Sequence, residues 1–406
     1  WLALNNGMAW AGYASEFSFY DESAGLTGNV YAAKAYKGMV FLGLSTGLFA
    51  NRGAKVVNGF GPFKEIKGAV YDFAIVGGDL AIACENGLYK YDGDRLELVY
   101  QLHARSLEFI PEQKTLLVGG KHGLAIFKTN GAIGYFGTVE EVFEETTEIA
   151  ASYSDQGKLS TIWLGFQQPG TARMELKEGP RYELDYFGEF EGLGNGYVRP
   201  FRSGDSFVFA TPSGLQYFVP PEEAGKVLGD SFVNEGFKGF FFFFFSDENQ
   251  LGKAAWGYFA DGGKEMFTLD NQLYLRMADG RLLKDRFNDL DIGKINCFDK
   301  LGNDAVLIGA NDGLAIYHKM KKRDIEQPFG TFIRKVATLP DSVIFKGNYY
   351  DSSVAGILME QPKDMVPELE YKNNSLVFEF VSNWYEKKDK IEYAVFLEGY
   401  HDDWMP

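Results

Sequence analysis

The residue types that could carry chemistry are few and scattered in this sequence. Gly43-Leu44-Ser45-Thr46-Gly47 has the G-x-S-x-G spacing that exposes a serine nucleophile between a strand and a helix. No strand-turn-helix pattern surrounds it, so we interpret Ser45 as a turn residue. The four histidines lack an i,i+4 pair and a neighbouring cysteine, so we expect surface positions rather than metal ligation. They are His103, His122, His318 and His401.

Three further patterns have a structural interpretation. Asp289-Leu290-Asp291-Ile292-Gly293 begins like a calcium loop, but Lys300 occupies the twelfth position, where a bidentate Glu is needed. Asn373-Asn374-Ser375 has the spacing of a glycosylation acceptor. The only dense basic cluster is interpreted as a solvated loop. It comprises Lys319, Lys321, Lys322 and Arg323. We therefore expect no catalytic residue, no metal and no cofactor, and the sequence singles out no ligand-binding residue.

Composition indicates a folded, acidic protein. The 406 residues are 46% hydrophobic and include 36 Phe and 23 Tyr, enough to bury a large core. Forty basic against 56 acidic side chains give a net charge of −16, which opposes nucleic-acid binding. The longest purely apolar run, Phe240 to Phe245, is far shorter than a membrane span. We interpret this run as a strand buried on both sides, with an exposed aromatic patch for carbohydrate as the alternative.

A short repeat organises the chain. Each copy has an apolar residue, then Gly or Ala, two variable positions, a polar residue, Gly, and Leu or Met. The copies are LALNNGM from Leu2, LGLSTGL from Leu42, IACENGL from Ile82, VGGKHGL from Val118, FATPSGL from Phe209 and IGANDGL from Ile308. Each copy predicts a strand, a tight turn that favours Gly, and a second strand. The small second residue predicts a close approach of another backbone.

The spacing of the copies predicts a propeller. Successive turn glycines lie 40, 40, 36, 91 and 99 residues apart, and the last two intervals are close to double steps. We place the missing copies at Ser154 to Gln167 and Ser246 to Ala260. About eight copies with a period of 40 to 50 residues, each preceded by another alternating stretch, indicate four-stranded blades. The predicted fold is all-β, with a propeller of seven to eight blades.

The repeat resembles the two-component regulator propeller repeats of bacterial sensor proteins. Trp1-Leu2-Ala3-Leu4-Asn5-Asn6-Gly7-Met8 matches the motif LWxGTxxGL of that family. The segment from Leu369 resembles the triple-tyrosine domain that follows such propellers just before the membrane. Its matching positions are Tyr371, Asn374, Leu376, Phe378, Tyr385, Tyr393, Leu397-Glu398-Gly399 and Trp404. The likeness implies a propeller over residues 1–330, then linker strands and a truncated, Ig-like β-sandwich over 331–406.

The resemblance implies a function. The chain would be the periplasmic, ligand-sensing region of a transmembrane regulator that is anchored in the inner membrane of a bacterium, with a histidine kinase or another effector beyond Pro406. It would bind a small molecule, such as a carbohydrate, or a protein, and would form a homodimer through its C-terminal domain. We expect no enzyme within these residues.

Two alternatives remain open: a propeller enzyme acting on carbohydrate, and a scaffold for protein partners. Ser154-Asp155-Gln156-Gly157 resembles the Asp-box of sialidases, but Arg199 and Arg202 are too few to supply their arginine cluster.

Overall fold

The computed structural model describes most of the chain. The described residues are 2–4, 7–9, 16–51, 59–153, 159–176, 182–204, 206–219, 240–242, 253–283, 287, 290–319, 330–339, 342–351, 356–358, 361–373, 375–383 and 391–405. They belong to two compact units. One unit is Glu16–Met320, and the other combines Trp1–Ser15 with Lys321–Pro406.

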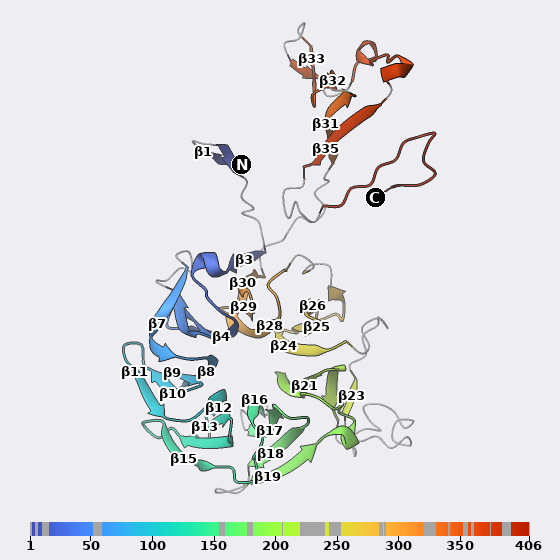
Figure 1. Cartoon of the computed structure of the whole chain (residues 1–406). Helices are drawn as coiled ribbons and strands as arrows, with labels where there is room; N and C mark the ends of the chain where they lie inside the picture. Colours follow the sequence, from blue (N-terminus) through green and yellow to red (C-terminus); the bar gives the residue numbers. More distant parts are fainter. Residues whose placement is uncertain are drawn as a thin grey trace. The chain divides into compact units, whose positions relative to one another are not determined.

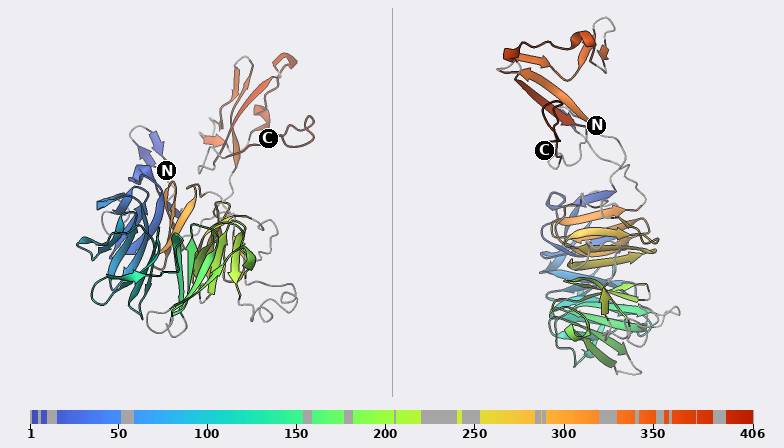
Figure 2. Two further views of the ribbon diagram at one scale, coloured as in Figure 1. Left: turned by 60° about the horizontal axis from the view of Figure 1, so that its bottom comes forward. Right: turned by 90° about the vertical axis from the view of Figure 1, so that its right-hand side faces the viewer.

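The larger unit is a β-propeller. Its described residues form seven antiparallel sheets of four strands each, so the predicted fold is confirmed with seven blades. In each blade the first strand faces the common axis and the fourth lies at the outside (Figures 1 and 2). The hydrogen-bonded order follows the chain order in six blades.

The first four blades contain sixteen strands. Blade 1 consists of β4 (Val30–Tyr36), β5 (Met39–Leu44), β6 (Gly47–Asn51) and β7 (Phe60–Lys67). Blade 2 consists of β8 (Val70–Val76), β9 (Asp79–Cys84), β10 (Gly87–Tyr91) and β11 (Leu96–Tyr100). Blade 3 consists of β12 (Ala104–Ile110), β13 (Thr115–Gly120), β14 (Gly123–Lys128) and β15 (Gly134–Thr138). Blade 4 consists of β16 (Thr146–Tyr153), β17 (Leu159–Phe166), β18 (Thr171–Leu176) and β19 (Tyr182–Phe187).

The remaining three blades complete the ring. Blade 5 consists of β20 (Arg199–Ser203), β21 (Ser206–Thr211), β22 (Gly214–Phe218) and β23 (Phe240–Phe242). Blade 6 consists of β24 (Ala255–Asp261), β25 (Lys264–Leu269), β26 (Gln272–Arg276) and β27 (Leu282–Leu283). Blade 7 consists of β28 (Ile295–Leu301), β29 (Ala305–Ala310), β30 (Gly313–His318) and the early strand β3 (Phe17–Tyr20). Short 3-10 helices, η1 (Glu22–Ala24) and η3 (Glu189–Glu191), precede blades 1 and 5.

The repeat copies within the propeller form the turn between the second and third strands of a blade. Leu44 pairs with Gly47 across a two-residue turn, and Gly120 pairs with Gly123 in the same way. Gly123 has a φ of 94°, a left-handed conformation that strains any residue with a Cβ atom. The prediction of a Gly-dependent turn is therefore confirmed.

The small second residue of each copy lies where the next blade begins. A Cβ atom on Gly43 would lie 2.6 Å from the carbonyl oxygen of Val70, in the first strand of blade 2. A Cβ atom on Gly119 would lie 2.8 Å from the carbonyl oxygen of Thr146, in the first strand of blade 4. These distances are shorter than a methyl group allows, so the predicted close backbone approach is confirmed.

One of the two copies placed in the wide intervals was wrong. In blade 4 the copy placed at Ser154 to Gln167 contains the second strand, β17, and the turn to β18 follows it and uses Gly170, with a φ of 106°. In blade 6 the segment up to Ala260 is the innermost strand, β24, and the turn between β25 and β26 is formed by Asp270 and Asn271. Both residues have positive φ, 48° and 64°, so blade 6 makes its turn without glycine. The copy at Leu2 forms a hairpin, β1 (Leu2–Leu4) with β2 (Gly7–Ala9), in the smaller unit.

The ring is closed by a strand from the other end of the propeller sequence. Strand β3 pairs antiparallel with β30, joining Phe17 to Tyr317 and Tyr20 to Leu314. Phe17 also packs its ring 5.8 Å from that of Phe287. Blade 7 therefore combines strands that are about 300 residues apart in sequence.

The apolar core of the described residues is divided among the blade interfaces. Seven buried clusters each combine side chains of two neighbouring blades. Leu42 of blade 1 and Leu307 of blade 7 share one cluster, whereas Trp163 of blade 4 packs its ring 4.8 Å from Phe209 of blade 5. Because each sheet buries both faces, most middle strands are continuous apolar runs. Each blade is thus stabilised by its two neighbours.

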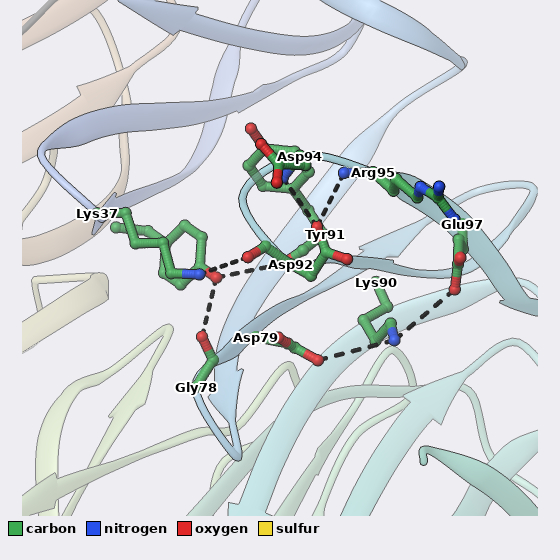
Figure 3. A network of polar contacts seen from close by, with 10 residues as sticks. Lys37, Gly78, Asp79, Lys90, Tyr91, Asp92, Asp94, Arg95 and Glu97 are labelled. Carbon is green, nitrogen blue, oxygen red and sulfur yellow. Dashed lines mark hydrogen bonds and ion pairs between the residues drawn. The ribbon is translucent and has the colours of Figure 1, made fainter.

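A polar network joins the β4–β5 turn of blade 1 to the β8–β9 and β10–β11 turns of blade 2 (Figure 3). The Tyr36 hydroxyl donates to the carbonyl oxygen of Gly78 at 2.9 Å, and the Lys37 ammonium donates to the carbonyl oxygen of Asp92. The Asp92 carboxylate accepts from the backbone N–H groups of Asp94 and Arg95, both at 2.8 Å. These contacts fix turns, so we assign this network a structural role.

The smaller unit is a β module. Strands β32 (Ser342–Phe345), β31 (Thr331–Thr338) and β35 (Leu376–Ser382) form a three-stranded sheet in that order. Strands β33 (Tyr349–Asp351) and β34 (Gly356–Leu358) form a hairpin, and two 3-10 turns, η6 (Lys363–Met365) and η7 (Tyr371–Asn373), precede β35. The ring of Tyr393 packs 5.0 Å from that of Phe380. Among the described residues, no helix is long and apolar enough to cross a membrane.

Candidate functional site

Six of the seven innermost strands carry a β-bulge at the same place. In blade 1 the pairing with β5 shifts between Val30 and Ala32, so that Tyr31 is the extra residue, and the other five blades follow the same pattern. We call the six bulged residues the bulge ring. They are Tyr31, Tyr71, Arg105, Thr147, Trp256 and Asn296. A bulge bends its strand and redirects the side chain, and all six side chains remain half-buried.

One half of the ring is aromatic. The rings of Tyr31 and Tyr71 stack with centroids 5.6 Å apart, and the imidazole of His103 lies 5.8 Å from that of Tyr71. The Arg105 guanidinium lies 4.5 Å from the centre of the Tyr71 ring and pairs with Glu145 at 3.1 Å. Contacts therefore run without a break from blade 1 to Glu145, the residue before the first strand of blade 4.

In the other half of the ring, two basic side chains lie against the indole of Trp256. The first strand of blade 5, β20, has no bulge and begins at Arg199. This residue pairs with Glu148 of blade 4, with Nε 2.9 Å from Oε1. Its guanidinium lies 4.5 Å from the centre of the Trp256 ring, and the Lys294 ammonium lies 3.1 Å from the same ring. Asn296 then donates to the carbonyl oxygen of Val30 at 3.0 Å, which returns the ring to blade 1. We call Arg199, Trp256 and Lys294 the basic corner.

Several buried polar atoms around the ring have no hydrogen-bond partner among the described residues. The set contains Nδ1 of His103, Oγ of Ser106 and Nε1 of Trp256, and its fourth member, Oε1 of Gln216, lies on a third strand. Buried polar atoms are satisfied in nearly all native proteins, so unpaired ones call for a ligand or water. Three of the four lie on or next to the innermost strands, which makes the ring the candidate binding site.

Two acidic side chains lie further along the innermost strands. The Asp72 carboxylate accepts from the backbone N–H groups of Phe73 and Leu107, both at 2.7 Å, yet burial raises its pKa to about 7. Burial and then the charge of Asp72 raise the pKa of Glu108 to about 8. The Tyr153 hydroxyl lies 3.1 Å from the carbonyl oxygen of Phe109 and donates to it. Both carboxyl groups therefore carry protons over part of the neutral pH range.

The structure disperses the residues that the sequence suggested for chemistry. Ser45 lies in the β5–β6 turn, where its Oγ accepts from the N–H of Asn29 at 3.1 Å, and no helix follows. Burial raises the pKa of the Cys297 thiol to about 12, so this cysteine is not a ready nucleophile. Among the described residues, no group of three His, Cys, Asp or Glu side chains could hold a metal ion.

The histidines and the basic cluster fall in different places. His122 lies in the β13–β14 turn, the His318 ring hydrogen-bonds Ser18 at 2.9 Å, and His401 belongs to the smaller unit. Lys319 pairs with Asp261. The remaining candidates lie outside the described residues. They are Asp289, Asn374, 154–157, 243–245 and 321–323.

A concavity lies at the other end of the innermost strands of blades 5 and 6. It has a volume of about 500 Å³ and is lined by the β20–β21 and β24–β25 turns and by β26. The Glu265 carboxylate lies in its wall, where it accepts from the Tyr258 hydroxyl and pairs with Arg276. Because these polar groups satisfy one another, this concavity is a weaker candidate than the bulge ring.

The comparisons with known proteins bear on the fold. No protein-family model matches the chain, and the search of curated proteins found no relative. The extracellular domain of a protein described as a hybrid two-component system of B. thetaiotaomicron aligns with 96% of this chain, with a TM-score of 0.62 and 15% identity. The chain has a β-propeller fold. The extracellular domain of a one-component system of the same organism aligns with 89% of it, with a TM-score of 0.54 and 13% identity.

The propeller fold also occurs in an enzyme among the similar structures. A catalytically inactive virginiamycin B lyase from Staphylococcus aureus aligns with 74% of this chain and 98% of its own, with a TM-score of 0.52 and 10% identity. By contrast, the chain spans about half the length of the two extracellular domains, 52% and 50%. At such identities the likeness establishes the fold, and function must be argued from the site.

Proposed function

We propose that this chain is the extracytoplasmic ligand-sensing region of a bacterial transmembrane signalling regulator, with two-component regulator propeller repeats and a partial triple-tyrosine domain. The bulge ring carries the proposal, because it gathers aromatic faces and nearby unpartnered polar atoms from several blades around the propeller axis. The fold shared with extracellular domains of such regulators supports it. The regulator would be a sensor histidine kinase, a hybrid or a one-component protein.

The proposed mechanism is a change of population between two arrangements. A ligand shifts such an equilibrium only if it binds one arrangement more tightly than the other. The ring is suited to this because its residues come from six of the seven blades, so a ligand that contacts several of them favours one blade spacing. The β module would pass the change toward an inner-membrane anchor and an effector outside these residues.

The ligand would be a small molecule that presents flat faces and hydrogen-bonding groups, as a carbohydrate does. Tyr31, Tyr71 and Trp256 supply aromatic surface, and the orphaned atoms of His103 and Ser106 supply hydrogen bonds. A protein that inserts a loop into the ring is the alternative occupant.

Ligand screening tests the proposal. The purified chain is incubated with mono- and oligosaccharides, and its melting temperature and the saccharides are both followed. We expect one saccharide to raise the melting temperature and to be recovered unchanged. If no saccharide is bound but an extracellular protein is captured through the ring, the chain is a scaffold for protein partners.

A carbohydrate-active enzyme is the second candidate function, and Asp72 and Glu108 favour it. Their pKa values of about 7 and about 8 would let one act as an acid at neutral pH. Product formation in the same incubations, abolished by Glu108→Gln, would establish this activity and refute a purely sensory role.

A further inference from the structure

We infer that the basic corner binds an anionic group, a carboxylate or a sulfate, and that the ligand is therefore an acidic saccharide. This inference rests on the proposed function, because it names the ligand class of the same ring. Its residues are Arg199, Trp256 and Lys294, which come from the beginnings of blades 5, 6 and 7.

The charge of Lys294 is not balanced by the described part of the chain. Its Nζ forms no ion pair with a carboxylate of a described residue and lies instead 3.1 Å from the centre of the Trp256 ring. Burial lowers the pKa of Lys294, and the positive charge of Arg199 lowers it further. A half-buried ammonium beside a second cation is costly unless an anion accompanies it.

The nearby acids are already engaged. Glu148 is bound by Arg199, and the Asp270 carboxylate accepts from the N–H of Ala254 at 2.9 Å. The Asp312 carboxylate lies against Gly293, at the turn that precedes β28. None of them forms an ion pair with Lys294, so the corner keeps one unmatched positive charge.

The unsatisfied groups of the corner are donors. The indole Nε1 of Trp256 can only donate, and it has no acceptor among the described residues. The Lys294 ammonium has three N–H donors, and no acceptor for them is found in the described part of the chain. Both groups require an acceptor, and an anionic oxygen is the strongest acceptor available.

The neighbouring aromatic half explains why the anion would be carried by a sugar. The rings of Tyr31 and Tyr71 stack on each other. Asn296, two residues after Lys294, hydrogen-bonds to Val30, the residue before Tyr31, and so links the basic corner to these rings. A pyranose ring can pack on such surfaces while its acidic group reaches Lys294. Inorganic anions would use the corner alone.

Calorimetry with matched pairs of saccharides tests the inference. The probes are a trigalacturonate and its carboxyl-reduced neutral form, and a sulfated carrageenan tetrasaccharide and its desulfated form. We expect at least one acidic member to bind at least tenfold more tightly than its neutral partner, and the pair that shows the difference identifies carboxylate or sulfate. Lys294→Met should remove this preference, whereas Lys300→Met, a lysine near the other end of β28, should keep it.

Three outcomes would overturn the inference. They are equal affinity of both members in both pairs, the absence of binding by all four probes, and an acidic preference that Lys294→Met leaves intact. If a neutral saccharide binds and Lys294→Met does not change its affinity, the anion site is refuted but the proposed ligand-sensing role is not. The fluorescence of the tryptophans reports whether the variant is folded.

Discussion

At the residue scale, substitutions of Gly123 and Gly131 distinguish the cost of backbone strain from the cost of a steric clash. Both have a left-handed φ, 94° and 91°, but a Cβ atom on Gly123 would lie 2.0 Å from the carbonyl oxygen of Val142, whereas one on Gly131 would meet nothing within 4 Å. Gly131→Ala should cost about 1 kcal/mol through φ alone. Gly123→Ala should cost at least about 2 kcal/mol more, or prevent folding. Urea denaturation measures both, and equal costs would contradict the close approach.

The carboxyl groups of Asp72 and Glu108 predict a dependence of stability on pH. Their pKa values in the folded protein lie above the unfolded values, so the protonated forms favour folding. This contribution is fully present below about pH 4 and is lost as pH rises through about 7 to 8. Between pH 5 and 8 the free energy of unfolding should therefore fall by at least about 1 kcal/mol. Denaturation with urea at both pH values measures it.

The double variant Asp72→Asn, Glu108→Gln is the control for this effect. It should flatten the profile between pH 5 and 8. Carboxylates whose pKa values are lowered, such as Asp92 and Asp261, lose their contribution only in stronger acid and do not interfere. A profile as steep as that of the wild type would show that other groups cause the dependence.

At the element scale, strand β3 should hold the ring closed. Phe17 packs against Phe287 and Tyr317, while Phe19 on the same strand is 51% exposed. Phe17→Ala should lower the free energy of unfolding by about 2 kcal/mol, and Phe19→Ala by under about 1 kcal/mol. Urea denaturation of the two variants tests this. An equal effect of both would mean that the closing strand contributes little to stability.

The elements also show what the sequence could and could not predict. The glycine spacing predicted the strands, turns and blade type because each copy must satisfy a local backbone geometry and a close approach. Blade 6 was missed because Asp270 and Asn271 form its turn in place of glycine. The closure by β3 and the bulge ring were not predictable, because both depend on pairing between strands. The one local sequence feature that pointed to the bulge ring was the dipeptide Val-Tyr, which occurs at Val30-Tyr31 and again at Val70-Tyr71.

At the scale of the whole molecule, a homodimer is predicted through the region from Tyr371 to Trp404. Strand β35 exposes several apolar side chains, including Val377 and Phe378, at 45% and 49%. Covering such side chains favours association. Light scattering on the purified chain should give twice the monomer mass. A monomer at high concentration, with and without ligand, would contradict the prediction.

The central claim is that the bulge ring receives the signal. Under the proposed function, its most direct test is the ligand dose response of the proposed membrane regulator, read from a target-gene reporter. Trp256→Ala should raise the half-maximal ligand concentration at least tenfold, while Tyr135→Ala, on the exposed outer strand β15, should leave it unchanged. An unchanged dose response in Trp256→Ala, or an equal shift in both variants, would contradict the account.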